Sequence, residues 1–236
     1  MRDLKERLFE EYKYKIELHA HTYPVSGCSD FECDEFAKRF VELGYDGVAV
    51  TNHFMPDYPS RFKDGAEAAE FYLKGCTDVK KAAGDKLSVY LGMEIRFTEN
   101  NNDYLVYGIN ESDVEKCFYY LDKGIDVFYK EFKNEKNIII QAHPFRDGLV
   151  RANPSSLDGV EVFNFHAGHN ARITEAAKFA SENNLIVSGG VDLHHDFQWG
   201  THSVRVKNLP KDSYDVAELI KSGEMLFVVG DSIVLP

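Results

Sequence analysis

The sequence has no long apolar runs and no paired cysteines. No apolar run in its 236 residues approaches the roughly 18 residues that a helix needs to cross a bilayer, so a membrane-spanning protein is not expected. The first fifteen residues are charged throughout, which argues against a secretory signal and predicts a cytoplasmic protein. Four cysteines, Cys28, Cys33, Cys76 and Cys117, form no CxxC pair. A disulfide scaffold is therefore not expected in a chain of this size.

Basic residues are also scarce. Lys and Arg total 27 against 39 Asp and Glu, which gives a net charge of −12. A surface this acidic repels the phosphate backbone of nucleic acids unless a basic patch overrides it. The one short basic cluster is the Lys pair at 80–81. A nucleic-acid polymer is thus disfavoured as a partner and a small phosphorylated substrate fits better, while the oligomeric state is left open.

Short apolar, β-rich runs alternate with stretches of helical period along the whole chain. Strands alternating with helices predict βα units and a parallel sheet. Runs that are apolar on both faces fit strands covered by helices. Seven or eight such units in a chain of this length predict a closed α/β barrel, with residues 1–236 as a single domain. The strand-like runs are 16–18, 47–50, 87–92, 104–109, 137–142, 159–164 and 185–191, followed by 204–206 and 227–229.

A histidine or an acid follows most of these strand-like runs. In a parallel barrel the carboxyl ends of all strands lie on one face, where active sites are built, so these side chains are expected to converge. Each of them alone could be an ordinary turn or core residue. Core packing, however, does not call for such residues after nearly every strand, and burying them without a metal leaves costly unpaired polar atoms. The residues are His19, His21, His53, Glu94, His143, His166, Asp192 and His194.

This mixture of imidazoles and carboxylates is typical of sites for Zn, Mn or Fe. Residues i and i+2 of an extended strand point the same way, so His19 is expected to act with His21, and Asp192 with His194. The carboxylate of Glu94 could bridge two cations, and paired cations activate a hydroxide and orient an ester oxygen. The sequence therefore predicts two or three divalent metal ions.

Six segments, in order along most of the chain, resemble the motifs of the PHP (polymerase and histidinol phosphatase) family. The resemblance implies an α/β fold of one distorted (β/α)7 TIM-like barrel. It also implies a metal-dependent phosphoesterase that acts through a hydroxide activated by two or three metals. The segments are ELHAHT (17–22), VAVTNH (48–53), GME (92–94), QAHP (141–144), VEVFN (160–164) and SGGVDLH (188–194).

The resemblance also implies a set of metal ligands, with two departures from the family pattern. The early Asp-or-His position falls on Cys28, whose thiolate would favour Zn, with Asp30 as the near alternative. No additional His lies between Glu94 and His143, so a second metal would be under-coordinated or absent unless His166 reaches it, and His166 could equally contact the substrate. Asn52 and Glu17 replace the usual Asp in their motifs and are expected to orient imidazoles. The implied ligands are His19, His21, Cys28, His53, Glu94, His143, Asp192 and His194.

Arginines near the predicted ligands are candidates for binding the substrate. Arg146 and Arg96 could fork onto phosphate oxygens, although each could instead form a surface salt bridge. Leaving-group protonation could come from a metal-bound water, His166 or His195. Two other functions stay open: a metal-dependent hydrolase of a non-phosphate bond, such as an amide or cyclic ester, and a non-catalytic accessory protein that retains a metal site.

Overall fold

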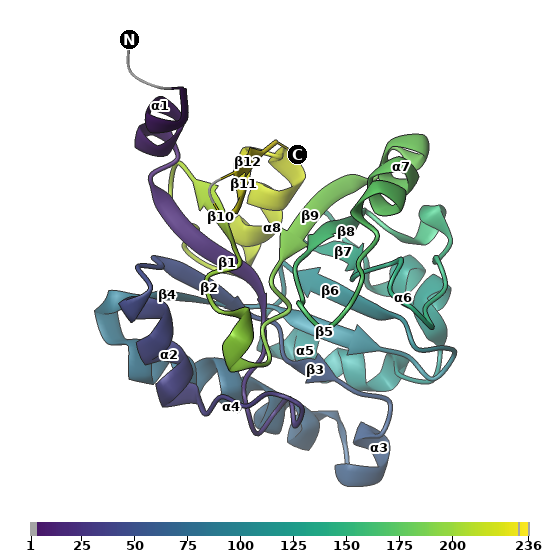
Figure 1. Cartoon of the computed structure of the whole chain (residues 1–236). Helices are drawn as coiled ribbons and strands as arrows, with labels where there is room; N and C mark the ends of the chain where they lie inside the picture. Colours follow the sequence, from purple (N-terminus) through teal and green to yellow (C-terminus); the bar gives the residue numbers. More distant parts are fainter. Residues whose placement is uncertain (1–3, 231, 236) are drawn as a thin grey trace.

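Two six-stranded sheets form the core of the protein (Figure 1). The computed structural model describes residues 4–230 and 232–235. The first sheet has the order β12-β11-β10-β1-β2-β4 and the second the order β3-β5-β6-β7-β8-β9. The strands are β1 (Tyr14–Ala20), β2 (Gly47–Val50), β3 (His53–Phe54), β4 (Ser88–Leu91), β5 (Met93–Arg96), β6 (Asp103–Tyr107), β7 (Ile138–Gln141), β8 (Gly159–Asn164), β9 (Ile186–Gly190), β10 (His202–Val206), β11 (Met225–Val229) and β12 (Ser232–Val234).

Helices surround the two sheets (Figure 1). The α-helices are α1 (Leu4–Glu11), α2 (Cys33–Glu42), α3 (Tyr58–Arg61), α4 (Gly65–Ala83), α5 (Glu111–Cys117), α6 (Gly124–Phe132), α7 (Ile173–Asn183) and α8 (Ser213–Ser222). Short 3₁₀ turns are η1 (Gly84–Lys86), η2 (Phe118–Tyr120), η3 (Pro154–Ser156) and η4 (Asp196–Gln198). Within 4–230 and 232–235, none of the helices combines the length and apolar character that a bilayer crossing requires.

The pairing of the strands is mixed. β1, β2 and β4 are mutually parallel neighbours, as are β7, β8 and β9, which agrees with the predicted βα units. β6 is antiparallel to both β5 and β7, and β10 is antiparallel to β1, so the expectation of parallel strands was wrong for these segments. The link from β5 to β6 is too short for a parallel crossover, which takes a dozen or more residues. The predicted single closed (β/α)7 barrel is not confirmed.

The two sheets adjoin at two places, and both carry site residues. β2 leads through Thr51 and Asn52 into β3, and the amide of Glu94 in β5 donates to the carbonyl of Asn52 at 3.0 Å. On the other side, the amide of His21 donates to the carbonyl of Leu193 at 3.0 Å. The ends of β1, β2, β5 and β9 are thereby brought together.

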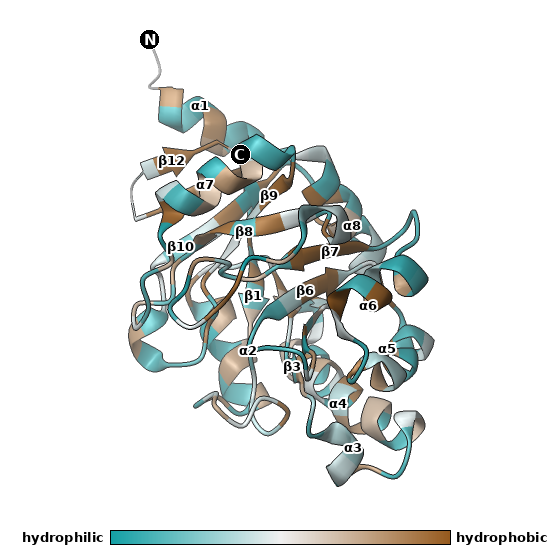
Figure 2. Ribbon diagram, turned by 90° about the vertical axis from the view of Figure 1, so that its right-hand side faces the viewer, coloured by the Kyte–Doolittle hydropathy of each residue, from teal (hydrophilic) through white to brown (hydrophobic). Residues whose placement is uncertain are grey.

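The hydrophobic pattern explains the packing. Ile138, Ile139 and Ile140 in β7 are fully buried, as expected of a strand that is apolar on both faces. On α2, Phe36, Ala37 and Phe40 form a buried apolar face. Figure 2 shows hydrophobic residues along β7 and β9, with hydrophilic residues on parts of the surrounding helices. The core thus holds the strand ends rigidly.

Candidate metal centre

The predicted site residues meet at one cavity of about 340 Å³. Three of them, His19, His21 and Glu94, have no exposed surface. The others line the cavity: Cys28, His53, Arg96, His143, Arg146, His166, Asp192, His194 and His195. Side chains that are up to 175 positions apart in the chain, such as His19 and His194, therefore share one environment.

Four buried side chains form a compact donor set. The Nε2 atom of His19 lies 3.3 Å from Glu94 Oε1, and the Nε2 atom of His21 lies 3.4 Å from Glu94 Oε2. Both Nε2 atoms lie 3.5 Å from Asp192 Oδ1. Ligands bound at about 2.0–2.1 Å with tetrahedral angles are roughly 3.3 Å apart, so these spacings suit one metal ion.

One atom of each of these four side chains has no hydrogen-bond partner in the part of the chain that the structure describes. Within 4–230 and 232–235, the Nε2 atoms of His19 and His21, Glu94 Oε2 and Asp192 Oδ2 are buried without a hydrogen-bond partner. An unsatisfied buried polar group costs about 1–3 kcal/mol, and more when it is charged. His53 Nδ1 is also without a hydrogen bond, although it lies only 2.8 Å from Glu94 Oε2. His53 Nδ1 and Glu94 Oε2 are thus close together without a hydrogen bond, an arrangement that fits two ligands of one metal ion.

Strained backbone helps to aim two of the side chains. Asp192 has φ of +56° and His143 has φ of +31°, a region that non-glycine residues rarely adopt. Such conformations cost on the order of 1–3 kcal/mol and cluster at functional sites. β9 ends at Gly190, so Asp192 and His194 do not alternate along a strand as predicted. They meet through this left-handed bend, which leaves His194 Nδ1 at 3.2 Å from Asp192 Oδ1.

A second group of carboxylates holds the candidate ligands in place. Glu161 Oε1 lies 2.8 Å from His19 Nδ1, and Glu161 Oε2 accepts a hydrogen bond from the amide of His143 at 3.1 Å. Since an ionised carboxylate only accepts, His19 carries a proton on Nδ1, and a bound metal would take the place of the second proton on Nε2. Glu17 accepts from the amides of His19 and Val191, both at 2.8 Å.

Asn52 acts on His21 through an intermediate hydroxyl. Ser26 Oγ donates to Asn52 Oδ1 at 2.9 Å and lies 3.1 Å from His21 Nδ1. The replacement of an Asp by Asn52 therefore leaves an acceptor in place at this position. Asn52 thus reaches the imidazole of His21 through Ser26, whereas Glu17 binds backbone amides rather than the imidazole that it was expected to orient.

Cys28, His53 and His194 form a neighbouring cluster. The Nε2 atoms of His53 and His194 are 3.3 Å apart. Burial opposes ionisation of the Cys28 thiol, but hydrogen bonds with His194 and His53 outweigh it and lower its pKa to about 6. Asp30, the alternative to Cys28, instead pairs with His195 at 2.9 Å. The geometry therefore favours Cys28 over Asp30 as the companion of the two imidazoles.

Charge compensation keeps the carboxylates ionised. Burial would raise the pKa of Glu94, but His19 and His53 outweigh it and hold that pKa well below its ordinary value. Burial also opposes ionisation of Asp192, whose pKa the charge of His19 and a hydrogen bond from His194 hold well below normal. Burial lowers the pKa of His21, helped by the nearby His194 and His53. Burial would lower the pKa of His19, but nearby carboxylates, Glu161 first, outweigh it and raise that pKa, so a bound cation would displace the proton from its Nε2.

Comparisons with known proteins bear on the fold. No protein-family model matches the sequence, and no curated protein matches it significantly. PsfC from Pseudomonas syringae is 14% identical over 86% of this chain and 88% of its own, with a TM-score of 0.58. A two-domain protein from Bacteroides vulgatus, described as containing a predicted PHP-like metal-dependent phosphoesterase, is 16% identical over 93% of this chain, with a TM-score of 0.57. This chain spans 66% of the length of the Bacteroides protein.

The chain shares its fold with these two proteins. The resemblance predicted from the six sequence segments is thereby confirmed at the level of the fold. Its buried His, Asp and Glu cluster could hold metal ions, as the sequence also predicted. The identity and the number of the ions stay predictions.

The two predicted arginines have different partners in the structure. Arg146 lies at the cavity wall with Nη1 3.8 Å from Asp192 Oδ2, so its guanidinium faces the candidate metal centre. Arg96 binds Asp103 through two hydrogen bonds of 2.7 Å. His166 lines the cavity, and burial lowers its pKa to about 4, so its imidazole is neutral at neutral pH.

Two acids of the site were missed in the sequence. Glu161 lies within the buried strand β8, where a charged residue is rare unless it has a partner, and that signal could have singled it out. Asp103 follows a run of asparagines, which is typical of a loop, and it reaches the cavity because β6 runs antiparallel to β5 and begins there. No local sequence signal separates Asp103 from a turn residue.

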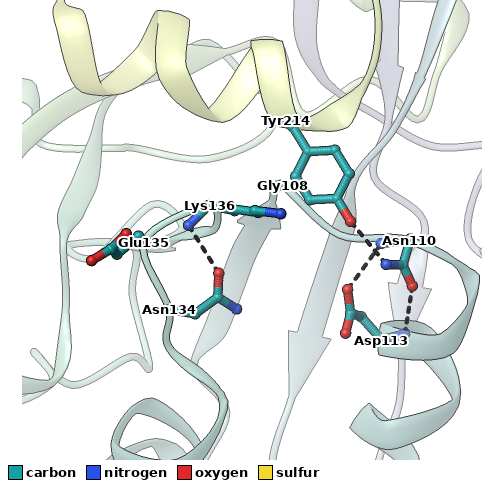
Figure 3. Close-up of a pocket in the computed structure, with 7 residues that line it drawn as sticks. All are labelled: Gly108, Asn110, Asp113, Asn134, Glu135, Lys136 and Tyr214. Carbon is teal, nitrogen blue, oxygen red and sulfur yellow. Dashed lines mark hydrogen bonds between the residues drawn. The ribbon is translucent and has the colours of Figure 1, made fainter.

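A second polar hollow of about 480 Å³ lies at the opposite end of β6 and β7 (Figure 3). Tyr214 reaches from α8 toward Asn110, whose Nδ2 donates to the Tyr214 hydroxyl at 2.8 Å. Asn110 and Asp113 also cap the start of α5 reciprocally. Asn110, Asp113 and Tyr214 thus bond to one another, while Glu135 and Lys136 are exposed.

Proposed function

We propose that the chain is a metal-dependent phosphoesterase that hydrolyses a small phosphate ester. The observation that carries the proposal is the buried donor set of His19, His21, Glu94 and Asp192, with tetrahedral spacing and unpartnered atoms, beside a cavity lined by Arg146. Burial of such unpartnered atoms is costly without a cation, and a cation beside an arginine is suited to a phosphate group.

The proposed ligands divide into three sets. His19, His21, Glu94 and Asp192 would hold one ion, and Glu94 with His143 would contribute to a second. The cluster of Cys28, His53 and His194 would hold a third. When bound, divalent ions supply Lewis acidity at a phosphoryl oxygen and lower the pKa of water toward neutrality.

The surrounding residues would bind and orient the substrate. Arg146 can direct its planar fork at two phosphate oxygens while its own charge balances Asp192. The neutral His166 is proposed to contact the substrate at the cavity wall. His195 is proposed as the proton donor to the leaving group, because Asp30 bonds its Nδ1 and leaves Nε2 available to the cavity.

A small phosphorylated compound is the proposed substrate. The cavity of about 340 Å³ lies at the lower end of the range for small-molecule sites, about 300–1,000 Å³. The net charge of −12 disfavours a long polyanion such as a nucleic-acid polymer. Arg146 and the candidate metal ions would provide positive charge locally, within an otherwise acidic protein.

The proposal is tested with a substrate panel. The chain is stripped of metal by chelation, reloaded with Zn²⁺, Mn²⁺ or Fe²⁺, and assayed against phosphomonoesters, phosphodiesters, amides and cyclic esters. We expect phosphoester turnover only after reloading, and none with Asp192→Ala. Cleavage of amides or cyclic esters alone would favour the non-phosphate alternative. A metal-loaded protein that is inert across the panel would favour the accessory protein.

A further inference from the structure

The second proposed metal site lacks a ligand in the sequence. The segment between Glu94 and His143 contains no histidine, so these two residues alone would hold the ion. The structure brings an acid from that segment to the same place. Asp103 is the first residue of β6 and pairs in register with Arg96 of the antiparallel strand β5. Its side chain is only 3% exposed and lines the cavity.

The distances connect Asp103 to the candidate metal centre. Asp103 Oδ2 lies 3.9 Å from His143 Nε2, which is itself 3.2 Å from Glu94 Oε1. Donor atoms of His53, Glu94 and Asp103 all lie within 4.8 Å of one another. Glu94 Oε2 is fully buried and has no hydrogen-bond partner within 4–230 and 232–235. An unsatisfied carboxylate oxygen thus shares this space with Asp103.

Arg96 fixes Asp103 without consuming all of its capacity as a ligand. Arg96 Nε donates to Oδ1 and Nη2 donates to Oδ2, both at 2.7 Å. A carboxylate has about four lone-pair sites, so a forked arginine leaves about two of them open. The fork holds the carboxylate in one orientation. The Arg96 N–H groups that bind Asp103 are among those that the sequence analysis offered as candidates for phosphate binding.

We propose that Asp103 is a metal ligand that completes a second cation site with Glu94 and His143, and that Arg96 positions it. The inference rests on the metal centre of the proposed function. A site with two carboxylates and one imidazole offers harder, less polarisable ligand atoms than the cluster of Cys28, His53 and His194. The second site is therefore expected to prefer Mn²⁺, while the cysteine-containing cluster prefers Zn²⁺.

The test counts bound metal rather than activity. The metal-free full chain is titrated with Mn²⁺ alone by calorimetry, and the bound ions are counted by elemental analysis. Asp103→Asn should lose one equivalent of Mn²⁺ relative to the wild type. Arg96→Gln should retain the wild-type count, because it leaves the Asp103 carboxylate in place. Asp158→Asn is the matched control, since it breaks the ion pair of Asp158 with Lys133 (3.5 Å) outside the cavity, and it should bind as the wild type does.

Two outcomes would overturn the inference. One is an Asp103→Asn protein that binds Mn²⁺ with wild-type count and affinity. The other is an Arg96→Gln protein that gains an equivalent, which would mean that the guanidinium stands in for the cation. If Asp103→Asn fails to fold, as circular dichroism would show, the Arg96→Gln count decides alone. A fully loaded wild type that cleaves no phosphoester would contradict the proposed function but leave the assignment of Asp103 intact.

Discussion

The protein contains two polar hollows at opposite ends of β6 and β7, and only one has the character of a reaction site. The hollow of Figure 3 is the larger, at about 480 Å³ against 340 Å³ for the cavity of the candidate metal centre. In the larger hollow, Asn110 bonds Tyr214 and caps α5 together with Asp113. In the smaller one, several buried imidazole and carboxylate atoms have no hydrogen-bond partner among the described residues. Unsatisfied burial, rather than volume, distinguishes the two.

The difference has an energetic meaning. Six buried atoms of the candidate ligands have no hydrogen-bond partner in residues 4–230 and 232–235. Each such atom costs about 1–3 kcal/mol. Together the six would offset much of the free energy of unfolding of a typical protein, which is roughly 5–15 kcal/mol. A bound cation removes this cost, while the larger hollow has none to remove. The predictions below test this contrast, from the largest effect to the smallest.

Glu94→Ala should have the largest effect, because Glu94 Oε1 and Oε2 contact His19, His21 and His143. We expect loss of bound metal and a fall in phosphoesterase kcat/KM of more than about 100-fold, since even residues that only support ligands cost 10–100-fold. Metal analysis and steady-state kinetics measure both. Asn110→Ala in the larger hollow serves as the control. Retention of metal and activity by Glu94→Ala would refute the contrast between the hollows.

Glu161→Gln should weaken metal binding without abolishing it. The amide keeps an oxygen near His19 Nδ1 but loses the charge that orients and polarises the imidazole. Removal of such a supporting group typically costs about 10–100-fold in metal affinity. Isothermal titration of the metal-free protein measures the change, and Glu161→Ala should bind more weakly still. Equal affinities for all three proteins would show that Glu161 serves only the fold.

The residues that the sequence predicted well are those that follow strands in a fixed order. The carboxyl ends of parallel strands converge whether or not the sheet closes into a barrel. The convergence of four site residues could therefore be predicted: His19, Glu94, His143 and Asp192. Asp103 could not, since it belongs to an antiparallel strand that begins at the site rather than ending there. A short apolar run does not reveal the direction of its strand.

The division into two sheets was also beyond the sequence. Alternating strands and helices predict βα units, but they do not show which neighbours share hydrogen bonds. The chain passes from the first sheet to the second at Asn52, between β2 and β3, and again at Gly92, between β4 and β5. Left-handed backbone at Asp192 and His143 was likewise invisible, because neither residue type requires it.

Arg146→Ala should reduce activity and leave metal content unchanged. Its side chain is 31% exposed, so the lost charge-assisted hydrogen bond should lie near the low end of the 1.5–3 kcal/mol range, or about tenfold in kcat/KM for phosphomonoesters. Arg151→Ala is the matched control, because Arg151 stacks on Phe145 in the same loop and does not line the cavity. Kinetics identical to the wild type would remove Arg146 from substrate binding.

Asn110→Ala should have the smallest effect, and it should act on stability alone. The change removes the side-chain oxygen that caps Asp113 and the bond from Nδ2 to Tyr214. Loss of a helix cap costs about 0.5–2 kcal/mol, which corresponds to a fall in Tm of a few degrees, about 2–4 °C per kcal/mol, in a chain of this size. Asn110→Asp, which keeps the capping oxygen, should recover most of that loss in a thermal melt. Metal content and kcat/KM should stay at wild-type values in both variants, because among the residues described no side-chain atom of the hollow of Figure 3 is buried without a hydrogen-bond partner. A fall in activity with Asn110→Ala that exceeds its fall in stability would give the larger hollow a functional role and end the contrast.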